Sequence, residues 1–170
     1  SISGSRISFD DGDDNIAIGK STLASITPGG EQNIAIGTNA MTNASGVNTD
    51  GNVVIGYNAG DAFGANNVYG SINSGDAAGT TAIGYNAGAS ITSGQYNLAI
   101  GYQALVTHTT GDNNIAIGYG AMDDTDAGST SLGSGDNVFI GEIAGGGTWA
   151  NAASNANVGI GNNVMDAAMN

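Results

Sequence analysis

The hydrophobic residues of this chain recur in one short unit, which reads Asn, an aliphatic residue, a small residue, Ile and Gly, usually with Ala three residues after the Gly. The unit occurs eight times. Its first positions are Asn15, Asn33, Asn52, Thr80, Asn97, Asn114, Asn137 and Asn157. Its isoleucines are Ile18, Ile36, Ile55, Ile83, Ile100, Ile117, Ile140 and Ile160. Its glycines are Gly19, Gly37, Gly56, Gly84, Gly101, Gly118, Gly141 and Gly161.

The spacing of these glycines indicates a coil with insertions. Successive glycines are 18, 19, 28, 17, 17, 23 and 20 residues apart. Repetition of one unit at spacings of about this length is typical of solenoid proteins. The longer spacings add residues rich in Gly, Ser, Asn and Asp, mainly between Phe63 and Gly79 and between Asp123 and Gly135, and such a composition is typical of loops. We therefore predict a minimum coil of 17 residues.

Each unit predicts a short β-strand followed by a corner. Alternate residues of a strand share a face, so Ile34 and Ile36 lie on one face and Ala35 lies on the other. The final glycine permits a backbone conformation that other residues rarely adopt. The alanines that follow are predicted to lie in a second short strand; they are Ala40, Ala59, Ala87, Ala104, Ala121 and Ala144.

These elements together predict an all-β fold, a parallel β-solenoid or β-roll of eight coils. Identical residues stack on successive coils of a solenoid, so the asparagines are expected to form a hydrogen-bonded ladder. Residues 15–165 form the roll in this interpretation. Residues 1–14 form an N-terminal cap or joining strand, and residues 166–170 form a C-terminal tail or junction.

So thin a roll is expected to need partner chains. A coil offers few large apolar side chains, whereas each ordered residue costs roughly 1–2 kcal/mol of backbone entropy. We therefore expect a homo-oligomer, and we expect the stripe of alanines to form its interface, because small side chains let two backbones approach closely.

The charge of the chain disfavours several partners. The net charge is −13, and Arg6 and Lys20 are the only Lys or Arg residues. Nucleic-acid binding depends on many such cations, so no nucleic-acid partner is expected. No apolar run approaches the length that spans a bilayer, so no membrane insertion is expected either, and any export signal is expected outside this sequence. The chain has no Cys.

The motif Ala-Ile-Gly followed by two residues and Ala, with turns such as Thr110-Gly111-Asp112-Asn113-Asn114 between copies, resembles the head repeats of trimeric autotransporter adhesins. Related repeats occur in bacteriophage tail fibres. The resemblance extends from Asn15 to Met165. It implies a homotrimer of left-handed rolls on the outside of a cell or virion. The spacing here is longer and less regular than in those repeats, and Thr80 replaces Asn in the fourth copy.

Aromatic residues provide the candidate ligand contacts. Tyr57, Tyr85, Tyr102 and Tyr119 each follow a motif glycine directly. Stacking of coils would align these rings, either for contact with a sugar or as a cover for the corner of the roll or the seam between protomers. Trp149, which follows three glycines, marks either an exposed contact or a packed cap.

Residues that could bind a metal or catalyse a reaction are few. The segment from Asp10 to Asp14 fails the EF-hand pattern. Asp11, Asp13 and Asp136 remain the candidate metal ligands, and a structural calcium ion is the only cofactor that the sequence leaves open. His108, the only histidine, is expected to be an exposed spacer residue. No serine lies in a nucleophile elbow, so no catalytic residue is assigned and no enzymatic activity is expected.

The sequence favours an extracellular fibre or adhesion module whose loops contact a host glycan or protein. The alternative is a subunit of a filament that stacks end to end, because the chain begins with the strand-like residues 6–9 and ends in the apolar pair Val164 and Met165. An enzyme is the third and least favoured hypothesis.

Overall fold

The computed structural model describes residues 6–8, 14–25, 30–44, 49–63, 77–125, 133–149 and 153–166. These residues form one sheet of nine strands, whose order in the sheet follows their order in the sequence. The strands are β1 (Arg6–Ser8), β2 (Ile16–Gly19), β3 (Ile34–Ile36), β4 (Val53–Ile55), β5 (Thr81–Ile83), β6 (Leu98–Ile100), β7 (Ile115–Ile117), β8 (Val138–Ile140) and β9 (Val158–Ile160).

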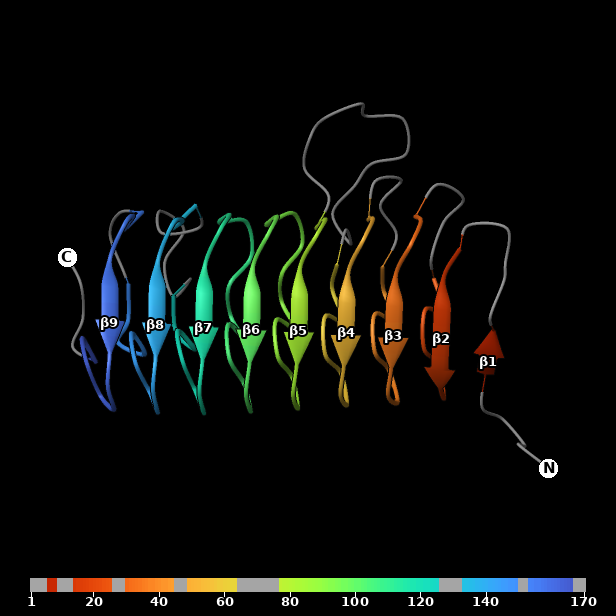
Figure 1. The fold of residues 1–170 in the computed structure, drawn as a ribbon, viewed down its shortest axis with the longest axis horizontal. Helices are drawn as coiled ribbons and strands as arrows, with labels where there is room; N and C mark the ends of the chain where they lie inside the picture. The colour runs from red at the N-terminus through yellow and green to blue at the C-terminus, as the bar shows by residue number, and fades with distance from the viewer. Residues whose placement is uncertain are drawn as a thin grey trace.

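Strands β2 to β9 are parallel, and β1 pairs with β2 in the antiparallel sense. Figure 1 shows the strands in a row along the long axis of the molecule. The described residues contain no helix. The prediction of an all-β parallel solenoid is therefore confirmed, and every copy of the motif supplies one strand.

The register keeps equivalent motif positions together. Val53 pairs with Thr81 and Ile55 pairs with Ile83, although the spacing between the motif glycines is longest at this point. The extra residues are therefore accommodated outside the sheet. Most of this insertion, residues 64–76, lies outside the described residues.

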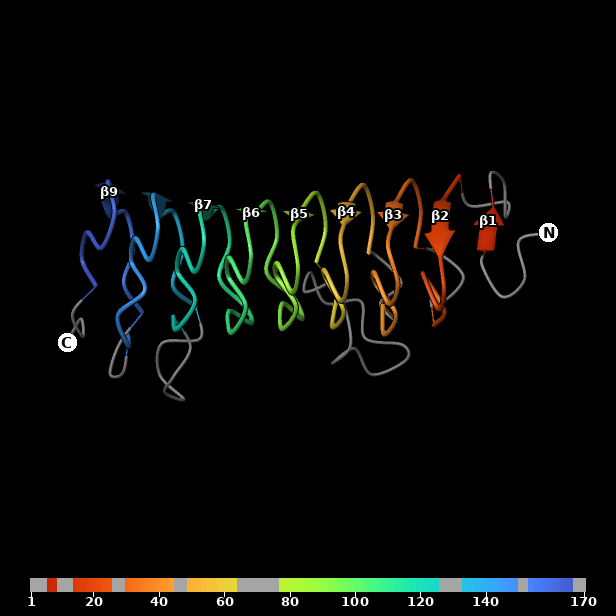
Figure 2. The same ribbon diagram turned by 90° about the horizontal axis from the view of Figure 1, so that it is seen from below.

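The sheet forms one wall of the solenoid and stacked turns form the opposite wall (Figure 2). In the turn after Gly37, Asn39 and Met41 have left-handed φ angles of 59° and 51°. The turns stack through backbone hydrogen bonds, such as that from Met41 N to Ala59 O at 3.0 Å. Since left-handed residues interrupt an extended chain, the prediction of a second strand is wrong. The alanines predicted to lie in that strand are nevertheless buried.

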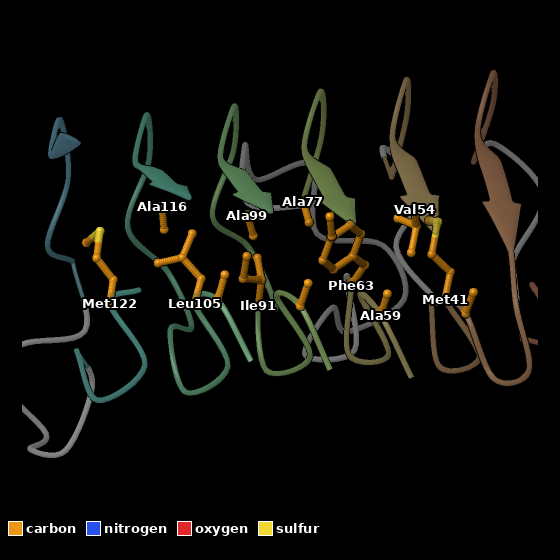
Figure 3. Packing of buried hydrophobic residues seen from close by; sticks show 14 of the residues in the cluster. Met41, Val54, Ala59, Phe63, Ala77, Ile91, Ala99, Leu105, Ala116 and Met122 are labelled. Atoms are coloured by element: carbon orange, nitrogen blue, oxygen red, sulfur yellow. The ribbon is translucent and has the colours of Figure 1, made fainter. Parts of the chain in front are cut away.

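The small side chains of the strands point into the core. Ala99 and Ala116 face the turn wall, from which Leu105 and Met122 point back toward the sheet (Figure 3). All four side chains are fully buried. The prediction that the alanine stripe forms an interface between chains is therefore wrong. The physical reason is the thinness of the coil: large side chains from the turn wall fill the interior and leave room for small side chains on most strands of the sheet.

The large core residue comes from either of two positions in the turn. In several coils it is the fourth residue after the motif glycine, as for Leu105 and Met122. In two coils that fourth residue is a glycine and a large buried residue follows three positions later, as Phe63 follows Gly60 and Ile91 follows Gly88. A Cβ atom on Gly60 would lie 2.9 Å from the Phe63 ring. Either arrangement places one large side chain at the same level of the core.

Strand β8 carries a large inward residue, Phe139, where most strands have Ala. Two glycines make room for it, since Cβ atoms on Gly145 and Gly159 would lie 2.7 Å and 2.6 Å from its ring. Trp149 packs against Phe139 edge to face, with ring centroids 5.7 Å apart. Both aromatic side chains are fully buried, so this coil has an aromatic core.

The motif glycines lie where consecutive coils approach most closely. Gly101 has a φ of 140°, a value that side-chain-bearing residues rarely adopt. A Cβ atom at this position would also collide with the carbonyl oxygen of Gly118 on the next coil. Glycine is therefore required both by conformation and by space.

Candidate functional site: the tyrosine ladder and the aliphatic face

A ladder of buried asparagines fixes the coils one above the other. The Oδ1 atom of Asn15 accepts hydrogen bonds from Asn33 N at 2.9 Å and from Asn33 Nδ2 at 3.1 Å. The second hydrogen on Asn33 Nδ2 is donated to Thr49 O at 2.7 Å. The same pattern joins Asn33 to Asn52. The predicted ladder is confirmed, and because its amides are buried and paired, it holds the strands in register.

Thr80 weakens the ladder at its fourth position. Its backbone N–H still donates to Asn52 Oδ1 at 2.8 Å. Its hydroxyl accepts from Asn97 N at 3.3 Å and donates to Gly94 O at 3.4 Å. A threonine hydroxyl has one proton, whereas an asparagine amide has two, so fewer hydrogen bonds can form here than at the neighbouring coils.

The tyrosines form a second ladder, which lies on the outside. We call Tyr57, Tyr85, Tyr102 and Tyr119 the tyrosine ladder. Their consecutive ring centroids are 5.3, 5.0 and 5.2 Å apart, with planes inclined by 9°, 7° and 6°. All four side chains are exposed. The predicted alignment is confirmed, and it includes Tyr57 in spite of the long insertion before Tyr85.

The outward residues of β2 to β9 form a broad apolar surface, which we call the aliphatic face. None of these residues is buried. They are Ile16, Ile18, Ile34, Ile36, Val53, Ile55, Thr81, Ile83, Leu98, Ile100, Ile115, Ile117, Val138, Ile140, Val158 and Ile160. Thr81 is the only polar member, and none carries a charge. A continuous apolar patch on the surface of a soluble protein usually marks an interaction site.

Trp149 is not part of any exposed surface. Its side chain is fully buried against Phe139, so it is not an exposed ligand contact. The other prediction for Trp149, a packed residue, agrees with this burial. No described residue accepts a hydrogen bond from its Nε1 atom.

His108 is buried, so the expectation of an exposed spacer residue is wrong. Its Nδ1 atom lies 3.0 Å from Thr125 Oγ1, and its Nε2 atom lies 3.0 Å from Gly111 O. The ring fits because residue 111 is a glycine, whose Cβ atom would lie 2.6 Å from the imidazole. His108 thus fills a polar corner of the coil, and the His-x-x-Gly spacing is the signal that could have indicated this role.

The carboxylates do not form a metal centre among the described residues, since no group of three or more metal-binding side chains occurs there. Asp11 and Asp13 lie outside the described residues. Asp136 is exposed, and its Oδ1 atom accepts a hydrogen bond from Asn113 Nδ2 at 3.2 Å.

Among the residues that the structure describes, two aspartates have a raised pKa. Burial raises the pKa of Asp123, and the nearby carboxylates of Asp124 and Asp166 raise it further. Burial also raises the pKa of Asp61, although a hydrogen bond from Asn43 opposes this rise.

Comparisons with protein-family models, with curated proteins and with solved structures found no match to this chain. In the part of the chain that the structure describes, no helix has the length and hydrophobicity needed to cross a membrane.

Proposed function

We propose that this chain is a module of an extracellular fibre, of the surface-adhesin or phage tail-fibre type, in which three copies associate through the aliphatic face. The observation that carries the proposal is the composition of that face. It presents Ile, Val or Leu at every outward position except Thr81. Burial of such side chains in an interface contributes about 25 cal/mol of favourable free energy for each Å² of apolar surface removed from water.

The distribution of charge supports self-association through this face. Copies of a chain with a net charge of −13 repel one another, so contact is favourable only where carboxylates are absent. The aliphatic face meets this condition, because none of its residues is charged. The number of three copies and a left-handed coil come from the resemblance to adhesin head repeats.

The shape of the molecule suits a fibre. Strands β1 and β9 lie at opposite ends of the long axis (Figure 1), so such modules can be joined in series. The asparagine ladder holds neighbouring coils in register, which favours a stiff rod. The turns, loops and tyrosine ladder would then be available to contact a host glycan or protein.

The alternative function, a filament subunit stacked end to end, is supported by the state of β9. Val158 and Ile160 are 68% and 70% exposed, more than any other residues of the aliphatic face. Gly161 keeps the φ of the other motif glycines, at 133°, but no atom of the described residues lies within 4 Å of the position of its Cβ. This end of the sheet could therefore receive a further coil, supplied by a second copy.

Light scattering over a range of protein concentrations tests both hypotheses, with and without calcium. A constant mass of three chains supports the trimeric module. Growth of the mass with concentration supports end-to-end stacking instead. A stable monomer at all concentrations would refute both, and a mass that depends on calcium would indicate a structural ion.

A further inference from the structure

The exposed part of the tyrosine ladder consists of ring edges and hydroxyl groups. Tyr85 and Tyr102 each have a stacked neighbour on both sides. They are nevertheless 44% and 43% exposed. Because neighbouring rings cover their faces, the exposed atoms belong to the edges and to the phenol groups. A ligand therefore meets a row of hydroxyls that both donate and accept hydrogen bonds.

The spacing of this row selects among extended polymers. The ring centroids are 5.0 to 5.3 Å apart and the ring planes are nearly parallel, so we infer that the hydroxyls repeat at a similar spacing. An extended peptide advances about 6.6 Å between side chains on one face, so it falls out of step with the ladder within a few residues. In a polysaccharide with equatorial linkages, each unit lengthens the polymer by one sugar ring and one bridging oxygen. This length per unit is close to the spacing between β-strands, and hence to the spacing of the tyrosine rings.

The charge of the protein narrows the class of polysaccharide. The ladder contains no charged side chain, and the chain as a whole carries a net charge of −13. This negative charge would repel sulfated or carboxylated polymers, which are also negative. An uncharged polymer with many hydroxyl groups is not repelled and can form a hydrogen bond with each phenol in turn.

We propose that the outer edge of the tyrosine ladder binds an extended, uncharged polysaccharide lying parallel to the long axis of the solenoid. This inference deepens the proposed function, on which it rests, by naming the class of surface ligand. Each sugar unit hydrogen-bonds to one tyrosine of the ladder. Binding therefore strengthens as the oligosaccharide lengthens, until it spans all four rings.

Calorimetric titration with β-1,4-linked oligosaccharides of glucose and of N-acetylglucosamine, from disaccharide to hexasaccharide, tests the proposal. We expect affinity to rise with length up to the tetrasaccharide and then to level off. The double variant Tyr85→Phe/Tyr102→Phe keeps the stacked rings but loses two central hydroxyls. It should bind the tetrasaccharide about tenfold more weakly.

Tyr96→Phe is the matched control, because Tyr96 is exposed but stands outside the ladder. It should bind like the unchanged protein, and melting curves should show that all variants remain folded. Absence of binding to every neutral oligosaccharide would overturn the proposal, as would equal binding by the double variant. Equally tight binding of sulfated oligosaccharides or of an extended peptide would overturn the ligand class.

The molar mass of the same samples separates this inference from the proposed function. A trimer that binds none of the oligosaccharides retains the fibre module but refutes the sugar site. A folded monomer that binds them refutes the assembly and retains the site.

Discussion

The hydroxyl of Thr80 accepts a hydrogen bond from the backbone N–H of Asn97 at 3.3 Å, in a place where most coils have an asparagine carbonyl oxygen. At the next coil, Asn97 Oδ1 accepts from Asn114 N at 2.9 Å and from Asn114 Nδ2 at 3.1 Å. Thr80 is therefore a weak point in an otherwise repeated buried network.

Replacement of Thr80 by Asn should stabilise the chain. The new amide can accept from the N–H and the side chain of Asn97 and can donate to Asn52 Oδ1, so the free energy of unfolding should rise by about 1 kcal/mol. Urea denaturation measures this change. The opposite change at the next position of the ladder, Asn97→Thr, is the control and should lower stability. A loss of stability in Thr80→Asn would mean that the coil has no room for the longer side chain.

Ile36→Asp should disrupt assembly while leaving the single chain folded. Ile36 is only partly buried and points away from the core, so an aspartate there meets solvent in a monomer. In an oligomer it would bring like charges together in an apolar interface. Light scattering should give the mass of one chain, and circular dichroism should give an unchanged spectrum.

Ala35→Asp is the matched control for Ile36→Asp, since the neighbouring residue faces the core and is fully buried. An uncompensated carboxylate there should cost several kcal/mol and unfold the chain. If Ile36→Asp retained the full oligomer, the aliphatic face would not be the interface.

Gly101→Ala should be far more destabilising than Gly161→Ala. Both glycines have φ angles that disfavour alanine, at 140° and 133°. That strain costs roughly 1–3 kcal/mol. Of the two, only Gly101 would place the added methyl group against the next coil, at Gly118 O, whereas no described atom lies within 4 Å of the Cβ position at Gly161. Thermal melting of both variants measures the difference, and equal losses would contradict close contact between the coils.

Asp123→Asn should stabilise the chain at neutral pH. In the unfolded chain the pKa of Asp123 is near 3.8, whereas burial and the carboxylates of Asp124 and Asp166 raise it in the folded chain. Between these two values the folded chain binds more protons, so the free energy of unfolding falls as the pH rises. The variant cannot lose a proton, so it avoids this loss of stability. The gain should be less than about 1 kcal/mol because the site is partly exposed.

Denaturation at pH 7 and below pH 3.8 measures the effect of Asp123→Asn. The gain in stability should vanish at the lower pH, where Asp123 is protonated in both states. Glu31→Gln removes an exposed carboxylate and is the control, which should change stability at pH 7 less than Asp123→Asn does. A gain that persists in acid would mean that charge is not its cause.

The sequence by itself determined the repeat, the strand in each copy and the two ladders. Residues at equal positions of a periodic chain stack once the strands pair in register, so Asn33 meets Asn52 and Tyr85 meets Tyr102 whatever the insertions between coils contain. The need for glycine at Gly101 also follows from the pattern, because a corner recurs at that place in every copy.

Only the tertiary structure decided which face of each strand is inside. Alternation separates Ile34 and Ile36 from Ala35 but does not say which side meets the core. The stacked turns decide it, because Leu105, Met122 and their equivalents fill the interior from the opposite wall and leave space for little more than alanine on most strands. For the same reason the sequence interpretation missed the burial of His108 and left that of Trp149 undecided. Both depend on turns and glycines that come together only when the coil closes.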